Sequence, residues 1–118
     1  MRVLVVDGAN VVGSKPDGWW KDRAGAARRL HERLLTADLT HDEVVLVLEG
    51  AAKGGVPAGR DGHLRTVHAK GSGDDEIVAQ ADRPDDTVVV ITADRMLQAR
   101  VAAVGASSMS PTWLLDHL

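Results

Sequence analysis

The chain has 118 residues, 44% of them apolar, and a formal net charge of −3 at pH 7. This length is typical of one domain, 1–118, and the charge argues mildly against a non-specific nucleic-acid binder. The absence of cysteine excludes disulfides and thiolate metal sites. No stretch approaches the roughly 20 apolar residues that a membrane span needs, and no signal peptide is visible. We therefore expect a cytoplasmic protein that does not associate with membranes.

The first half of the chain predicts strands separated by a helix. Residues 2–6 (RVLVV) and 43–48 (EVVLVL) are unbroken apolar runs, which are typical of strands buried on both faces. Between them, apolar side chains recur at helical spacing and predict a helix over 20–37, with Trp20 at the start of its apolar stripe. The stretch 50–62 holds five glycines and a proline, and this composition predicts a flexible loop.

The second half continues the alternation of strands and helices. LRTVH (64–68) and TVVVIT (87–92) predict two further strands. Within 71–81, a Gly/Ser loop leads into a helix with acids in its first turn, where the helix dipole favours them. A helix over 94–104 is followed by a C-cap glycine. The chain closes with ASSM as an edge strand and PTWLLDHL as a helix.

This order of elements predicts an α/β fold with a central, mostly parallel sheet of four or five strands, covered on both faces. In such sheets, ligands bind beyond the carboxyl ends of the strands. Acidic residues gather at the predicted ends of the strands and at the helix that follows the third strand. They are Asp7, Glu49, Asp74, Asp75 and Asp94.

Carboxylates brought to one edge of a sheet repel each other, and a hard divalent cation such as Mg²⁺ or Mn²⁺ removes that repulsion. Such a cation also polarises a phosphoryl oxygen and activates a water. We therefore hypothesise that Asp7, Asp74 and Asp94 hold a metal ion. Each acid also has a simpler structural interpretation. Asp7 and Asp94 suit helix caps, Asp74 and Asp75 suit first-turn acids, and Glu49 suits a solvated strand end.

Other motifs and surface features are less specific. The sequence has no G-x-G-x-x-G fingerprint, no Walker A sequence and no G-x-S-x-G elbow, and its five histidines show no metal-ligand spacing. The basic residues of the 20–37 helix fall largely off its apolar stripe, and either track an RNA backbone or form a solvated face. Trp19 and Trp20 either stack on a base or pack at the rim of the core.

Three segments in a fixed order resemble a known family. VVDGANVVGS, GSGDDEIVAQA and VVVITADRMLQARVAAVGA are similar to the NYN domain, a branch of the PIN-like nucleases, and in particular to its YacP-like bacterial members. The resemblance spans nearly the whole chain. It implies a PIN-like three-layer α/β/α sandwich and metal-dependent cleavage of RNA phosphodiesters. It places the family's first acid on Asp7, its helix-start acid on Asp74 with Asp75 beside it, and its late acid on Asp94.

The resemblance also covers polar residues around these acids. The family's polar partner of the first acid falls on Asn10, and a frequent basic residue falls on Arg95. The chain departs from the family in having Glu49 where relatives often carry Asp, and T-A-D where Ser commonly precedes the late Asp. We hypothesise that Asp75 binds the metal through water or orients the nucleophile. We predict further that Asn10, Arg95, Lys70 and Lys15 bind substrate, the three cations by stabilising phosphate charge.

The predicted function is that of an enzyme, a metal-dependent ribonuclease that hydrolyses RNA internally with the help of Mg²⁺ or Mn²⁺. We expect RNA as its partner, including RNA of the ribosome, and we expect that the domain can form a homodimer. One alternative keeps the metal site but hydrolyses nucleoside triphosphates or another small phosphate ester. A second alternative is a non-catalytic NYN domain that binds RNA or a partner.

Overall fold

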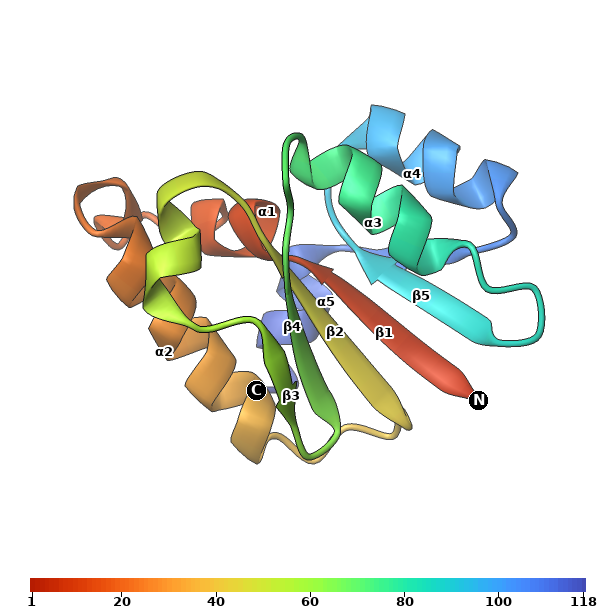
Figure 1. The fold of residues 1–118 in the computed structure, drawn as a ribbon, viewed down its shortest axis with the longest axis horizontal. Coiled ribbons are helices and arrows are strands. Elements are labelled where there is room, and N and C mark those ends of the chain that lie inside the picture. Colours follow the sequence, from red (N-terminus) through yellow and green to blue (C-terminus); the bar gives the residue numbers. More distant parts are fainter.

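A six-stranded sheet runs through the middle of the molecule in the computed structural model, which describes residues 1–118 (Figure 1). The strand order is β3-β4-β2-β1-β5-β6, and every neighbouring pair is parallel except β3 and β4. The strands are β1 (Arg2–Asp7), β2 (Glu43–Leu48), β3 (Gly59–Asp61), β4 (Leu64–His68), β5 (Thr87–Ile91) and β6 (Ser107–Met109).

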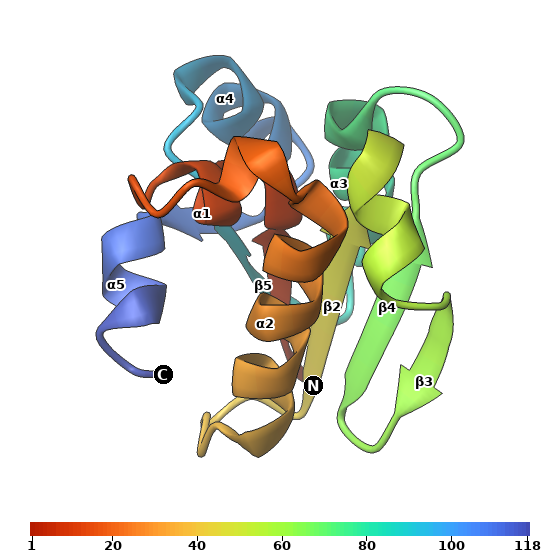
Figure 2. The ribbon, with the colours of Figure 1, turned by 90° about the vertical axis from the view of Figure 1, so that its left-hand side faces the viewer.

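Helices cover both faces of this sheet, as Figures 1 and 2 show. One face carries α1 (Gly8–Gly13), α2 (Arg23–Thr36) and α5 (Pro111–Leu115), and the other carries α3 (Gly73–Ala81) and α4 (Arg95–Ala103). Two short 3₁₀ helices, η1 (Trp19–Lys21) and η2 (Gly50–Gly55), lie beside α2. No helix is both long enough and apolar enough to cross a membrane.

Two apolar cores explain why the central strands read as unbroken apolar runs. Leu4 and Val6 of β1 belong to the core beneath α1, α2 and α5, whereas Val3 and Val5 belong to the core beneath α3 and α4. All four side chains are fully buried. Successive side chains of a strand point to opposite faces, so a strand between two helical layers needs apolar residues at every position. The prediction of an α/β/α sandwich is confirmed.

The chain reverses its direction of travel across the sheet between β1 and β5. From β1 it moves outward to β2 and β4, and α3 then carries it back past β1 to β5. The connection from β1 to β2 runs over one face of the sheet, and the connections through α3 and α4 run over the other (Figure 2). A crevice for a ligand is expected outside the carboxyl ends of strands at such a reversal. The fold thus singles out the ends of β1 and β5.

The segment 50–62 is the clearest departure from the predicted elements. Instead of a flexible loop it forms η2 and β3, and β3 gives the sheet a sixth strand. Gly55 packs so closely on α2 that a Cβ there would lie 2.0 Å from the backbone oxygen of Ala24. Lys53 Nζ donates to the Ala69 carbonyl oxygen at 2.8 Å and ties η2 to the end of β4. The prediction was wrong because this glycine permits close packing rather than mobility.

The start of the first long helix also differs from its prediction. α2 begins at Arg23 rather than near position 20, because Asp22 Oδ1 accepts a hydrogen bond from the Gly25 N–H at 2.9 Å and acts as its N-cap. Trp20 therefore lies outside α2, in η1, with 55% of its surface exposed. Its prediction as the start of the apolar stripe was wrong, and the stripe is built from residues further along the helix.

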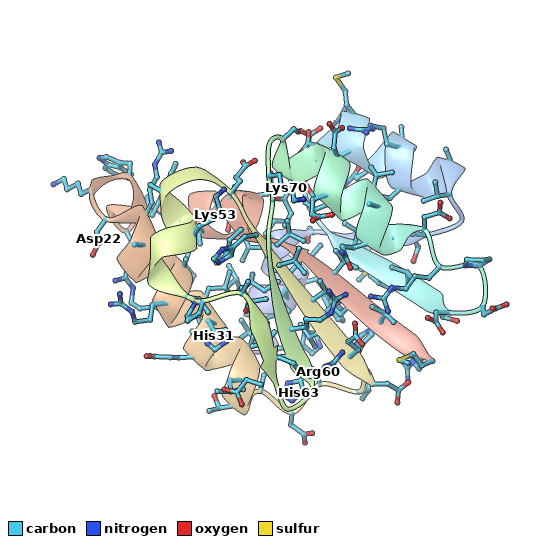
Figure 3. All side chains as sticks on the ribbon, in the orientation of Figure 1. Asp22, His31, Lys53, Arg60, His63 and Lys70 are labelled. Carbon is cyan, nitrogen blue, oxygen red and sulfur yellow. The ribbon has the colours of Figure 1, made fainter.

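An ion cluster occupies the opposite end of the sheet from the carboxyl ends of β1 and β5. Glu43, the first residue of β2, is only 7% exposed. Its carboxylate accepts hydrogen bonds from Arg60 at 3.2 Å and Arg83 at 3.1 Å, and Arg65 lies 3.6 Å away. Figure 3 shows Arg60 at this end of the sheet, well separated from Lys70 at the other. The three guanidinium groups compensate a carboxylate that burial alone would disfavour.

Candidate active site

Asp7 ends β1 and caps the helix that follows without an intervening loop. It is buried, and its Oδ1 accepts a hydrogen bond from the Asn10 N–H at 3.3 Å as the N-cap of α1. The sequence did not predict this six-residue helix. Gly8 allows it, because a Cβ at Gly8 would lie 2.6 Å from the Val47 carbonyl oxygen on β2. The capping interpretation of Asp7 is therefore confirmed, and the same geometry holds its carboxylate at the strand end.

A small polar network joins the ends of β1 and β5. Thr92 Oγ1 donates to Asp7 Oδ2 at 3.0 Å, and the same hydroxyl accepts from the Asp94 N–H at 3.2 Å. Asn10 Oδ1 accepts from the Ala93 N–H at 2.8 Å. Thr92 is completely buried, so its hydroxyl has a fixed place between the two acids. The network thus ties the Asp7 carboxylate to the backbone N–H of Asp94, at the strand ends where the chain reverses.

Asp94 is the N-cap of α4. Its Oδ1 accepts from the N–H groups of Met96 at 2.9 Å and Leu97 at 3.1 Å, while Oδ2 takes part in no hydrogen bond. The prediction of a helix cap at this position is confirmed. The cap leaves one oxygen of Asp94 exposed at the edge of the sheet. Arg95, the next residue, is exposed and forms no salt bridge or side-chain hydrogen bond.

The first turn of α3 supplies two further carboxylates. Asp74 is partly exposed and takes part in no hydrogen bond. Asp75 is more exposed and pairs with Arg100 of α4, with 2.8 Å between Oδ1 and Nη2. Both acids therefore lie in the first helical turn, as their structural interpretation predicted. Of the two, Asp74 is the one whose oxygens are free for a ligand.

Glu49 belongs to the same group of acids, although the sequence suggested a solvated strand end. Its Oε2 accepts from the Gly73 N–H at 2.6 Å, so a side chain at the end of β2 satisfies the N-terminus of α3. A Cβ on Gly73 would lie 2.5 Å from that oxygen, and the contact therefore requires glycine. The solvated interpretation of Glu49 was wrong. We call Asp7, Glu49, Asp74 and Asp94 together the acid edge.

Gly73→Ala tests this contact. The added methyl group displaces Glu49 and leaves the Gly73 N–H without its acceptor, so we expect a loss of about 1 kcal/mol in the free energy of unfolding. Gly71→Ala is the matched control, because a Cβ at Gly71 meets nothing within 4 Å. Urea denaturation of both variants measures the difference. Equal stability of the two variants would show that the Glu49 contact contributes nothing.

Electrostatic repulsion within the acid edge is visible in the pKa values of two members. Burial raises the pKa of Asp7 above 3.8, and hydrogen bonds from Thr92 and Asn10 oppose this shift. The negative charges of Asp74 and Glu49 raise the pKa further. Burial also raises the pKa of Asp74, again with help from neighbouring acids, chiefly Asp94 and Glu49. Asp7 and Asp74 therefore lie close enough to neighbouring carboxylates for those charges to disfavour their own ionised forms.

The acid edge has the chemistry of a divalent-cation site but not a completed ligand shell. Its donors are all carboxylate oxygens, the ligands that Mg²⁺ and Mn²⁺ prefer, and their mutual repulsion is the kind that a cation relieves. Unused oxygens remain on Asp74, Asp94 and Glu49. However, no three acidic or histidine side chains converge closely enough to hold an ion as they stand. The metal site of Asp7, Asp74 and Asp94 therefore stays a prediction.

The other predicted substrate-binding residues are spread over the surface. Lys70 is exposed in the loop before α3, beside a shallow hollow that Asp75 also lines. Lys15 lies in a groove between α1, α2 and α5 instead of at the acid edge. The side-chain oxygen of Asn10 holds the turn after β5. Thr92 and Arg100 were not predicted from the sequence, and the only sequence signal for Thr92 is its position directly after the apolar run of β5.

The fold and the position of the acids define the class of the molecule: a three-layer α/β/α sandwich with carboxylates at the reversal point of its sheet. The chain is similar to the crystal structure of a mutant of Rae1 (YacP) from Bacillus subtilis, with a TM-score of 0.72 and 19% sequence identity. The match covers 98% of this chain and 74% of that one. At this identity the similarity shows the fold alone. No family model and no curated protein matches the chain.

Proposed function

We propose that the chain is a metal-dependent ribonuclease of the NYN type. The observation that carries this proposal is the acid edge itself, in which Thr92 links the carboxylate of Asp7 to the backbone N–H of Asp94 at the reversal point of the sheet. Ligands of open α/β sheets bind at this point. The ordered motifs that resemble the NYN domain, and the fold shared with Rae1 (YacP), support the same function.

In the proposed mechanism, Asp7, Asp74 and Asp94 hold Mg²⁺ or Mn²⁺. A bound ion of this kind polarises a phosphoryl oxygen and lowers the pKa of a bound water. The buried network around Thr92 fixes the orientation of Asp7, so this ligand needs no reorganisation when substrate arrives. Asp74 and Asp94 present unused oxygens on the open side of the edge. Arg100 holds Asp75 beside the site through their ion pair.

The surface also offers cations for the phosphates of a substrate. Arg95 and Lys70 flank the acid edge from the starts of α4 and α3, and both are exposed. Lys15, Arg29 and Arg33 line the groove between α1, α2 and α5, and none of them forms a salt bridge. Cations without acidic partners are the ones that phosphate groups bind at the lowest desolvation cost. RNA fits this surface better than an uncharged substrate does.

The test offers the purified chain a structured RNA, an unstructured RNA, ATP and GTP in separate reactions, each with Mn²⁺ and again with EDTA. We expect RNA fragments that appear only with metal. Asp94→Asn should cut the rate about 100-fold, because it removes one predicted ligand while asparagine still caps α4. Asp22→Asn is the matched control, since Asp22 is also an N-cap and Figure 3 shows it well separated from Lys70.

The same experiment decides between this proposal and its alternatives. Phosphate released from ATP or GTP with no RNA fragments would support a hydrolase of small phosphate esters. RNA binding with no turnover of any substrate would support a non-catalytic domain. Full activity of Asp94→Asn would exclude the proposed ligand set. Association with ribosomal RNA and formation of a homodimer stay predictions, and sedimentation with ribosomes and light scattering measure them.

A further inference from the structure

A pocket of about 350 Å³ adjoins the acid edge on the side of α1 and α2. Gly8, which follows Asp7, and Glu49 line it, so the pocket and the acid edge share a wall. Trp19 and Arg23 also line the pocket, as does Gly71 from the loop before α3. This volume lies within the usual range of sites for small organic groups. Nothing in the proposed hydrolytic chemistry accounts for this pocket.

The indole of Trp19 is held in place on the wall of the pocket. The Arg23 guanidinium lies over the ring with its Cζ 5.4 Å from the centroid, and Trp20 contacts it edge-on at 6.0 Å and 88°. Gly18 precedes the pair with a φ of 83°, a left-handed conformation that glycine adopts readily, and so turns the chain into η1. The aromatic wall is therefore preorganised, and little entropy is lost when a ring packs on it.

The lining of the pocket matches the chemistry of a nucleotide. Its floor is apolar and built from small or aliphatic side chains, and one wall is aromatic, as the face of a nucleobase requires. The Arg23 guanidinium lies over Trp19 but forms no salt bridge, so its N–H groups remain available to bind a phosphate in a bidentate manner. The apolar floor consists of Val12, Ala27, Leu48 and Ala52.

A second groove, of about 220 Å³, continues from this pocket across α1. Val12 lines both, and the second one is lined by three cations, Lys15, Arg29 and Arg33, together with one acid, Asp17. The chain as a whole has a net charge of −3, yet these three cations have no acidic partner within salt-bridge distance. A positively charged groove next to an aromatic platform is the arrangement that single-stranded nucleic acids recognise. The two hollows therefore suit consecutive nucleotides of one strand.

We propose that the pocket lined by Trp19 and Arg23 binds one nucleobase of a single-stranded RNA, stacked on Trp19, with its phosphate at Arg23. A base seated there brings the adjoining phosphodiester to the wall that the pocket shares with the acid edge, at Gly8 and Glu49. The cleaved bond and the recognised base are then neighbours in the strand. The inference deepens the proposed nuclease function, and it makes Trp19 and Arg23 the residues that position the substrate.

The test measures binding without cleavage. Fluorescence anisotropy of a labelled eight-nucleotide unstructured RNA is recorded in EDTA for the wild type and for paired variants. We expect Trp19→Ala to weaken binding about ten-fold, the effect of removing one base–aromatic stack, and Trp19→Phe to restore most of it. Trp113→Ala is the matched control and should bind as the wild type does, because Trp113 lies in α5 and lines neither hollow. Circular dichroism confirms that each variant is folded.

A second pair of variants tests the phosphate contact. Arg23→Ala should weaken binding several-fold and lower its salt dependence, whereas Arg28→Ala, an exposed arginine of the same helix that lines no hollow, should do neither. Unchanged binding in both folded Trp19→Ala and Arg23→Ala would overturn the proposal. Mononucleotides added as competitors identify the source of the base. Competition only by RNA indicates a strand, and equal competition by free nucleotides indicates a single-nucleotide site.

Binding in EDTA and cleavage in Mn²⁺ are independent results. Binding that depends on Trp19, without cleavage under any condition, would retain this pocket and exclude the nuclease. Cleavage by the wild type, with equal binding by Trp19→Ala, Arg23→Ala and their controls, would retain the nuclease and exclude this pocket. If the nuclease activity and the base-binding pocket are both confirmed, Trp19→Ala should raise the KM for a short RNA more than it lowers kcat. This is expected for a residue that acts mainly through binding.

Discussion

Asp7→Asn is expected to lower RNA cleavage at least 100-fold and to leave the fold intact. Asp7 is the buried member of the acid edge, and Thr92 and the Asn10 N–H hold both of its oxygens in place. The amide has the same shape, keeps one oxygen for a donor and removes the charge. A predicted metal ligand that loses its charge loses affinity for the cation, and the assistance of such a group typically contributes 10² to 10⁴ in rate.

The same substitution is expected to raise stability at neutral pH. The pKa of Asp7 is raised above its ordinary 3.8, chiefly by burial, so the folded state disfavours the ionised form. Between 3.8 and the raised value, the folded chain binds more protons than the unfolded one, and stability falls as the pH rises. Asparagine has no charge to bury, so the Asp7→Asn variant escapes this loss. In thermal melts from pH 4 to pH 8, the melting temperature of the wild type should fall relative to that of the variant as the pH rises.

Activity and stability should therefore change in opposite directions, as expected for a residue kept for function at a cost to the fold. Asp116→Asn is the control for the loss of one acidic charge, because Asp116 is exposed at the end of α5. We expect it to leave both the rate and the melting temperature unchanged. An Asp7→Asn variant that cleaves RNA as fast as the wild type would remove Asp7 from the mechanism, whatever its stability.

The sheet and its two cores could be predicted because they depend on local pattern. Apolar runs such as 43–48 specify buried strands wherever they pair, and the alternation with helices leaves few arrangements of a parallel sheet. The positions of Asp7, Asp74 and Asp94 follow from the same logic, since the carboxyl ends of parallel strands meet at one edge. Strand ends are thus the part of a site that sequence reasoning places well.

The contacts that organise the acid edge could not be predicted in this way. Thr92 and Asp7 are 85 positions apart, and a threonine after a strand has no pattern that specifies its partner. Glu49 meets Gly73 only because β4 and the loop before α3 bring them together, and the sequence assigned this glycine only to the Gly/Ser loop before the helix. The flexible loop predicted around Gly55 was wrong for a related reason. Close backbone packing and mobility both favour glycine, and the sequence alone does not distinguish them.

The largest effect on stability is expected from Glu43→Gln, at the end of the sheet opposite the acid edge. The buried carboxylate of Glu43 faces Arg60, Arg65 and Arg83. Removing one partner from a buried ion cluster typically costs several kcal/mol, because the remaining charges stay partly desolvated. Arg60 is about half exposed and can turn to water, so we expect the lower part of that range, about 3 kcal/mol in the free energy of unfolding.

The pH dependence of this loss distinguishes Glu43 from the acid edge. Burial alone would raise the pKa of Glu43, but the hydrogen bonds from Arg60 and Arg83 and the nearby guanidinium charges outweigh it and lower the pKa below 4.5. The lowered pKa stabilises the folded state at pH values above 4.5. This stabilisation is lost as the pH falls through the pKa of Glu43 in the folded state. Asp7 has the opposite dependence, since its ionised form opposes folding.

Urea denaturation of Glu43→Gln at pH 7 and at pH 3 measures both effects. We expect a large deficit relative to the wild type at pH 7 and a smaller one at pH 3, where protonation begins to remove the wild-type charge as well. Glu32→Gln, an exposed residue of α2 without a salt bridge, is the control and should be neutral at both values. A deficit that is equal at pH 3 and pH 7 would assign the effect to packing. In that case the ionised carboxylate would not be what holds the three arginines together.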